Sequence, residues 1–340
     1  MSSDISRRKF LGSASLGVGA LGVPNYLPEE ESEKKDLVEL PHAVTVGTIS
    51  IADITAPNTQ DMIQQVLAKM EDMARCKPDI ICLPEIFAFA HIPNFRYQPQ
   101  EVAEKVPGAV VTPFLNFAAR HKCYVICPTY SLSGGNIYIS AVLIDRQGKV
   151  IGEYHKNRPA AEEMKMGITP GKTPPPVFQT DFGKIGIQIC FDIKYDDGWN
   201  HLKDNGAQII FWPSAYSAGR EINSRAWRHQ VYVVTSTQKD SSKICDVTGE
   251  VISQTGRWQS WACTSVNLEK VFVLAWPAVS KFPDILRKYG DRIRLNTFSE
   301  EEWAIFESLD KDLKIADVLN EFNIKTAYDA LKELAILHKK

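Results

Sequence analysis

The chain has 340 residues, of which 44% are hydrophobic and 24% are charged. Its 39 basic residues nearly balance its 41 acidic residues, which excludes a strong electrostatic field for nucleic acid or for an anionic membrane surface. We therefore expect a globular protein that acts on a small molecule, without nucleic acid and without stable membrane insertion.

The N-terminal segment predicts export. An arginine pair, Arg7 and Arg8, is followed by KFL and then by small apolar residues in a stretch too short to span a bilayer. This pattern resembles a bacterial twin-arginine signal, so we interpret residues 1–27 as that signal and expect a periplasmic or secreted protein. The alternative is a frayed amphipathic N-terminus. Residues 28–40 are rich in charge and indicate a solvated linker.

The first elements of the folded part alternate between strand and helix. Residues 43–51 alternate in polarity and are rich in β-branched side chains, which predicts a strand. Residues 58–76 have apolar side chains at helical spacing, with an Asn and a Thr at the start as possible caps and Pro78 as the stop. The short apolar run 78–85 then predicts a buried strand with Glu85 at its carboxyl end.

A helix at 112–120 and a buried strand at 123–128 precede two predicted hairpins. The first hairpin ends at Lys156. The other hairpin begins at residue 177 and ends at Cys190. The sequence therefore places an ammonium and a thiol at strand ends, as it does the Glu85 carboxylate.

Further apolar strands are predicted at 207–215 and 230–237, and residues 264–276 suggest one long strand. Strands interleaved with helices and hairpins indicate an α/β layered domain, which we assign to residues 41–280. The acidic, helix-forming sequence beyond it predicts a helical C-terminal extension at 281–340.

Glu85, Lys156 and Cys190 form a candidate catalytic set, because sites in α/β sheets lie just beyond the carboxyl ends of strands. Each residue also has an ordinary structural explanation. Cys190 could be a core thiol, Glu85 a solvated or paired acid, and Lys156 a surface lysine with a buried stem. It is their coincidence that favours catalysis.

The motifs around these residues resemble those of the nitrilase superfamily of carbon–nitrogen hydrolases. The resemblance lies in LPEIFAF at Glu85, YHKNRP at Lys156 and GIQICFDIK at Cys190, with further matches that include residues 213–215, and it covers about residues 43–275. It implies a four-layer α-β-β-α sandwich and hydrolysis of an amide or N-carbamoyl substrate through a cysteine thioester. It also implies a homo-oligomer, a dimer or larger, and no metal or organic cofactor.

The resemblance also implies a role for each residue. Glu85 would act as general base and acid, and Lys156 would stabilise the oxyanion together with a backbone N–H, that of Phe191. Glu163 matches a second glutamate that many relatives hold near the lysine. Its neighbour Glu162 is nearly as well placed, and both could simply be solvated loop residues.

Some positions depart from the family pattern and leave the substrate open. Relatives commonly have an aromatic residue, Pro and Glu at 195–197, where this chain has Tyr-Asp-Asp, and often Glu-Asn at 228–229, where it has Arg-His. Nitrile-cleaving relatives usually have Cys-Trp-Glu where this chain has Cys-Phe-Asp at 190–192, which favours the amidase and N-carbamoyl branches. Two alternatives remain: an inactive exported binding protein on the same fold, and a metal-dependent phosphoesterase.

The seven cysteines show no CxxC pair and no metal-finger spacing, so the composition predicts no disulfide framework. Export would nevertheless place them in an environment that permits disulfides.

Overall fold

The computed structural model describes residues 42–338. The predicted signal, residues 1–27, and the predicted linker, residues 28–40, lie outside that range. Within residues 42–338, no helix combines the length and the apolar character needed to cross a membrane.

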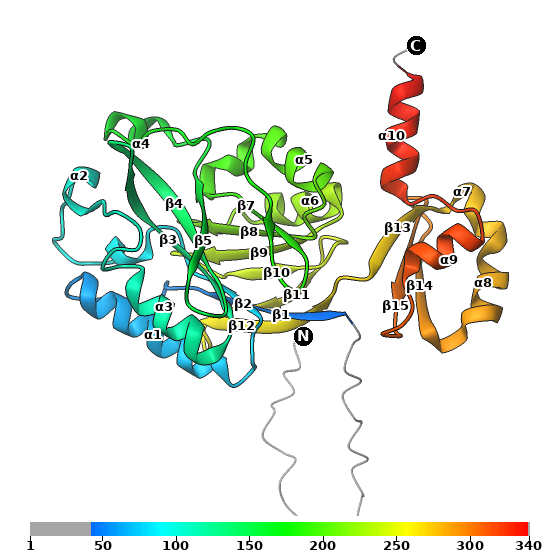
Figure 1. Ribbon diagram of the computed structural model, residues 1–340, viewed down its shortest axis with the longest axis horizontal. Coiled ribbons are helices and arrows are strands. Elements are labelled where there is room, and N and C mark those ends of the chain that lie inside the picture. Colours follow the sequence, from blue (N-terminus) through cyan, green and yellow to red (C-terminus); the bar gives the residue numbers. More distant parts are fainter. Residues whose placement is uncertain (1–41, 339–340) are drawn as a thin grey trace, which may run out of the picture. The chain divides into compact units, whose positions relative to one another are not determined.

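The first sheet has six strands in the order β12-β1-β2-β3-β4-β5. The strands β1, β2 and β3 run parallel, and the others pair antiparallel. Helices α1 and α3 cover this sheet (Figure 1). The bounds are β1 Ala43–Ile49, α1 Thr59–Ala74, β2 Ile80–Cys82, α3 Thr112–His121, β3 Tyr124–Ser133, β4 Asn136–Ile144, β5 Val150–His155 and β12 Trp261–Asn267.

The second sheet also has six strands, in the order β11-β10-β9-β8-β7-β6, with β7, β8 and β9 parallel. Helices α5 and α6 lie on its outer side (Figure 1). The bounds are β6 Phe178–Gln179, β7 Lys184–Ile187, α5 Asp196–Asp204, β8 Ile209–Ser214, α6 Arg220–His229, β9 Tyr232–Thr237, β10 Lys243–Cys245 and β11 Val251–Gln254.

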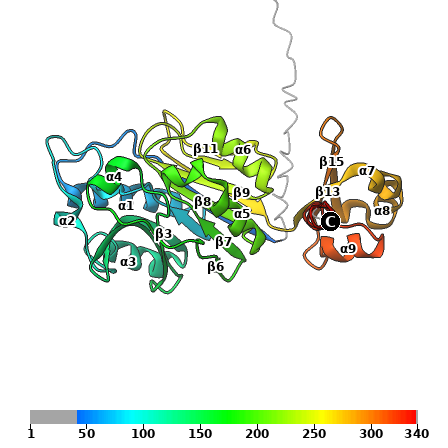
Figure 2. The same cartoon turned by 90° about the horizontal axis from the view of Figure 1, so that it is seen from above.

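The two sheets pack face to face between the helical layers, as the second view also shows (Figure 2). Strands β8 and β9 are buried along their whole length, which explains their continuous apolar sequence. Polar contacts also join the sheets, since Ser236 Oγ donates a hydrogen bond to the Ile49 carbonyl at 2.8 Å. The predicted α/β class, with sheets flanked by helices, is confirmed.

Four short helices connect these elements near the carboxyl ends of the strands. They are the 3-10 helix η1 Phe87–Phe89, α2 Pro99–Val102, α4 Ala161–Lys165 and the 3-10 helix η2 Cys190–Lys194.

The C-terminal segment contains the predicted helices, and it also contains strands that the sequence analysis did not expect. A three-stranded sheet in the order β13-β15-β14 packs with these helices around its own apolar core, which includes Phe282, Phe306 and Val318. The bounds are β13 Lys270–Leu274, α7 Ala275–Ala278, η3 Val279–Lys281, α8 Phe282–Tyr289, η4 Gly290–Arg292, β14 Ile293–Phe298, β15 Trp303–Ser308, α9 Ile315–Glu321 and α10 Ala327–Leu337.

The prediction of one long strand at 264–276 is wrong. The chain leaves the first sheet after Asn267 and enters the three-stranded sheet at Lys270. The buried Asn267 side chain accepts a hydrogen bond from Glu269 N at 2.9 Å and donates one to the Ser308 carbonyl at 2.8 Å. A side chain that bonds the backbone two residues later favours a turn, and this one divides the apolar run.

Candidate active site

Glu85 lies just past strand β2 and is almost completely buried. Its Oε1 accepts a hydrogen bond from Lys156 Nζ at 2.8 Å, and its Oε2 accepts one from Ala215 N at 3.0 Å. Gln238 Nε2 donates to its backbone carbonyl at 2.6 Å. Both carboxylate oxygens and the backbone are therefore fixed by elements of both sheets.

Lys156 directly follows strand β5, and its side chain is 1% exposed. Besides Glu85, its Nζ donates to Glu163 Oε1 at 2.8 Å and to Glu163 Oε2 at 2.9 Å. Burial lowers the pKa of Lys156, but the nearby Glu85, Cys190 and Glu163 outweigh burial and raise it above its usual value. Because a buried charge needs partners, the two carboxylates hold this side chain as an ammonium ion.

The structure distinguishes Glu163 from Glu162. Glu163 lies in α4 and turns inward, where its Oε2 also accepts a hydrogen bond from Ala160 N at 2.6 Å. Glu162 is exposed and pairs with Lys165 at 2.7 Å on the surface. Of the two candidates, only Glu163 contacts Lys156.

Cys190 lies in a turn rather than at the end of a strand as the sequence predicted. Strand β7 ends at Ile187, and Cys190 has φ 46°, in the left-handed region, where it opens η2. A non-glycine residue in this region is strained unless its surroundings hold it. This backbone conformation occurs at the residue whose sulfur contacts Ser214 and Ala215 at the end of strand β8.

The buried Asp192 carboxylate holds this turn. Its Oδ2 accepts hydrogen bonds from Ile189 N at 2.8 Å and from the Tyr154 hydroxyl at 2.6 Å, and its Oδ1 accepts one from Arg158 N at 2.7 Å. Burial raises the pKa of Asp192 to about 6 although these donors lower it. Tyr154 and Arg158 lie two residues before and two residues after Lys156. Asp192 therefore connects the turn at Cys190 to the segment that contains Lys156.

The sulfur of Cys190 faces the other candidates. Burial and, after it, Glu85 raise the pKa of this thiol to about 12, whereas Lys156, the Ser214 hydroxyl and the Ala215 N–H lower it. Cys190 is therefore a neutral thiol near pH 7 and needs a base to become a nucleophile. The structure thus brings Glu85, Lys156, Glu163 and Cys190 together.

Phe191 is the second residue of η2. The first bond of this helical turn runs from Asp192 N to the Ile189 carbonyl at 3.0 Å. The Phe191 N–H precedes that bond, so it belongs to the donors that a helix start leaves without an intrahelical acceptor. Phe191 directly follows Cys190 in the chain, so this N–H belongs to the same turn as the thiol.

The sequence analysis assigned no role to Tyr154, Ser214 or Ala215. Ser214 and Ala215 belong to the matching motif at 213–215, so the sequence carried a signal for them. Tyr154 likewise opens the matching motif YHKNRP, but only the fold shows that its hydroxyl reaches Asp192.

Three of the five positions that depart from the family pattern form ion pairs: Asp196, Asp197 and Arg228. Asp196 pairs with Arg225 and, at 3.4 Å, with Arg228, while Asp197 pairs with Arg158 at 2.6 Å. These pairs join the start of α5 to α6 and to the segment after Lys156.

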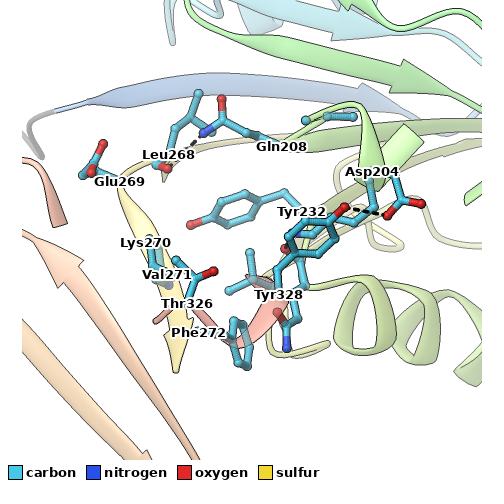
Figure 3. Close-up of a pocket in the computed structure, with 15 residues that line it drawn as sticks. Asp204, Gln208, Tyr232, Leu268, Glu269, Lys270, Val271, Phe272, Thr326 and Tyr328 are labelled. Carbon is cyan, nitrogen blue, oxygen red and sulfur yellow. Dashed lines mark hydrogen bonds between the residues drawn. The ribbon is translucent and has the colours of Figure 1, made fainter. Parts of the chain in front are cut away.

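Figure 3 shows the residues that line a second place in the molecule, a cavity of about 420 Å³. Its lining includes Gln208, Tyr232, Lys270 and Tyr328 and none of the five predicted site residues. Among residues 42–338, no group of three or more His, Cys, Asp or Glu side chains is arranged to hold a metal ion.

Comparisons with known proteins bear on this arrangement. The carbon-nitrogen hydrolase family model matches residues 43–271. A nitrilase of Pyrococcus abyssi is 32% identical over 161 residues, which are 46% of this chain and 61% of that protein. A deaminated glutathione amidase of Synechocystis is 23% identical over 63% of this chain and 89% of that protein. A beta-ureidopropionase of Arabidopsis thaliana is 29% identical over 54% of this chain and 48% of that protein.

Among solved structures, an amidase from Nesterenkonia superposes with a TM-score of 0.58 at 16% identity. The superposition covers 66% of this chain and 90% of that one. At this identity the similarity concerns the fold.

Proposed function

The chain belongs to the carbon–nitrogen hydrolase family, and we propose that it hydrolyses a linear amide or an N-carbamoyl compound through a thioester on Cys190. One observation carries this proposal. The buried Lys156 ammonium bridges Glu85 and Glu163 in a cluster that also holds the Cys190 thiol. Such convergence of titratable groups in a buried cluster is typical of catalytic sites.

In the proposed first half-reaction, Glu85 accepts the proton of the Cys190 thiol while the sulfur attacks the carbonyl carbon of the substrate. The carbonyl oxygen becomes an oxyanion, which Lys156 and the Phe191 N–H stabilise. The loss of one such donor slows an enzyme by roughly 10²- to 10³-fold. Glu85 then gives its proton to the departing ammonia or amine, and the thioester remains.

In the second half-reaction, Glu85 takes a proton from water, whose oxygen attacks the thioester carbon. The carbon–sulfur bond breaks, the acid or carbamate product leaves, and the proton returns to the sulfur. The proposed chemistry uses groups of the chain and water, and we propose no metal or organic cofactor.

The relatives support this substrate class in part. They are named as a nitrilase, an amidase and a ureidopropionase, so the family match leaves the choice among nitrile, amide and N-carbamoyl compounds open. The Cys-Phe-Asp sequence at 190–192 favours the latter two for this chain.

Incubation of the pure protein with panels of amides, N-carbamoyl amines and nitriles, with ammonia release as the readout, tests the proposal. Mass spectrometry of the quenched reaction should find the acyl group on Cys190, and Cys190→Ala should abolish both signals. Activity confined to nitriles would overturn the substrate class. An inert protein whose Cys190 alkylates no faster than Cys127, which is fully buried, would favour the binding-protein alternative instead.

We also propose that residues 1–27 direct export to the periplasm by the twin-arginine route. Replacement of Arg7 and Arg8 by lysine should retain the protein in the cytoplasm in cell fractionation. We propose further that the protein is a homo-oligomer, which sedimentation of the pure chain tests directly.

A further inference from the structure

We propose that Cys76 and Cys263 are a redox-active pair that closes a disulfide under oxidising conditions. The proposal concerns a site away from the candidate active site and does not depend on the hydrolase function. The cysteines lie far apart in sequence, and both are free thiols in the structure.

The strand register places the Cys263 side chain on the face of the sheet that helix α1 covers. In the antiparallel β1–β12 ladder, Cys263 lies directly opposite Gly47, and directly opposed residues point to the same face. A Cβ atom at Gly47 would overlap Met73 Sδ in α1, so that face is the one on which α1 packs. The Cys263 side chain therefore points at the layer that contains the end of α1.

The end of α1 brings Cys76 to the same place. The last helical turn continues to Cys76, whose N–H donates to the Met73 carbonyl at 2.9 Å. The guanidinium of Arg75 lies 5.6 Å from the centre of the Trp261 ring, which is two residues before Cys263 on the same face of β12. This contact and that of Met73 at Gly47 place the helix end over β12 beside Cys263.

The Cys76 thiol lies close enough to Cys263 to affect its ionisation. Burial and then Cys76 raise the pKa of Cys263 to about 12. Cys76 is exposed, whereas Cys263 is partly covered. Cys76 is therefore the sulfur that an oxidant in solution reaches first, and Cys263 is the thiol that resolves the product.

With oxidised glutathione as the oxidant, the steps balance. The Cys76 sulfur attacks the glutathione disulfide and releases one glutathione thiol. The Cys263 sulfur then attacks Cys76 in this mixed disulfide and releases the second. Two S–H bonds of the protein are lost, one S–S bond forms, and two electrons pass to glutathione, which takes up both protons.

The closed disulfide would join the end of α1 to β12 across a loop of more than half of the chain. Cross-links that close long loops restrict the unfolded chain most, so we expect the oxidised protein to unfold at a temperature higher by roughly 5 °C.

The pair Cys82 and Cys127 provides an internal control. These thiols lie on the adjacent strands β2 and β3, but both are fully buried, and no oxidant in solution reaches them. Disulfides that form because the protein unfolds would involve Cys82 and Cys127, whereas the proposed disulfide in the folded protein would leave both as thiols.

The test uses the reduced full-length protein, equilibrated with oxidised glutathione, alkylated, digested without reduction and mapped by mass spectrometry. We expect a Cys76–Cys263 peptide that lacks two hydrogens, alkylated Cys82 and Cys127, and a rise in unfolding temperature that dithiothreitol reverses. Cys76→Ser, at an exposed position, should form no cross-linked peptide and show no rise in unfolding temperature on oxidation. Cys263→Ser should give the same two results. Alkylation of both Cys76 and Cys263 after oxidation, a stable glutathione adduct on Cys76, or a link to another cysteine would each overturn the proposal.

Discussion

Replacement of Glu163 by glutamine would remove the charge that faces Lys156 Nζ through two oxygens, at 2.8 and 2.9 Å. A hydrogen bond to a charged group contributes about 1.5–3 kcal/mol. Because about 1.4 kcal/mol corresponds to a tenfold change in rate, we expect kcat/KM to fall roughly ten- to a hundredfold. The physical reason is that Lys156 would then have Glu85 as its only charged partner. Glu85, the proposed base, would be held in that ion pair and would be less free to accept a proton.

Glu162→Gln is the matched control, because it changes the adjacent glutamate, whose side chain is 78% exposed and pairs with Lys165 on the surface. We expect this variant to keep kcat/KM within about twofold of the original, since exposed ion pairs contribute little. Steady-state kinetics on one amide substrate measures both variants, with thermal unfolding as the check that each is folded. Equal activity of the two variants would refute a role for Glu163 in the site.

Three other predictions test the electrostatics and the packing. Glu85→Gln should abolish hydrolysis yet move the pH profile of Cys190 alkylation by iodoacetamide to lower pH, because the Glu85 charge adds to burial in raising the thiol pKa. An unmoved profile would contradict this. Tyr154→Phe should lower the free energy of unfolding in urea by about 1.5–3 kcal/mol, because it removes a donor to a buried carboxylate, and a change below about 0.5 kcal/mol would speak against that contact. Gly47→Ala should destabilise by about 1–3 kcal/mol because its Cβ would overlap helix α1. Gly256→Ala, which meets open space, should change little, and equal effects of the two would refute the packing.

The sequence predicted most strands and helices between residues 43 and 237 and named the residues of the candidate site, because these depend on local patterns. Strand β2 ends at Cys82, three residues before Glu85, and strand β5 ends at His155, directly before Lys156. A buried strand with a charged residue at its exit is visible in a single sequence.

What could not be predicted depends on contacts between distant segments. The turn at Cys190 ends β7 early because the Asp192 carboxylate bonds Ile189 N and the Tyr154 hydroxyl. The strand break after Asn267 depends on the Ser308 carbonyl, more than forty residues away. No periodicity within either segment contains this information, since an apolar run looks the same whether or not a distant partner interrupts it.

The distinction between Glu162 and Glu163 has the same origin. Both lie in the first turn of α4, where an acid is favourable on either side. Only the position of the helix relative to strand β5 decides which of them reaches Lys156.

The number of carboxylates at Lys156 has a chemical reason in the proposed mechanism. With Cys190 neutral, the cluster of Glu85, Glu163, Lys156 and Cys190 carries one negative charge in excess. Loss of the thiol proton to solvent would make that excess two in a buried site, which is unfavourable. Transfer of the proton to Glu85 keeps the excess at one, and it stays at one when the negative charge moves from sulfur to the oxyanion. During that interval Glu85 is neutral and no longer balances the Lys156 ammonium. Glu163 does so instead, so Lys156 remains charged at the stage when the oxyanion needs it.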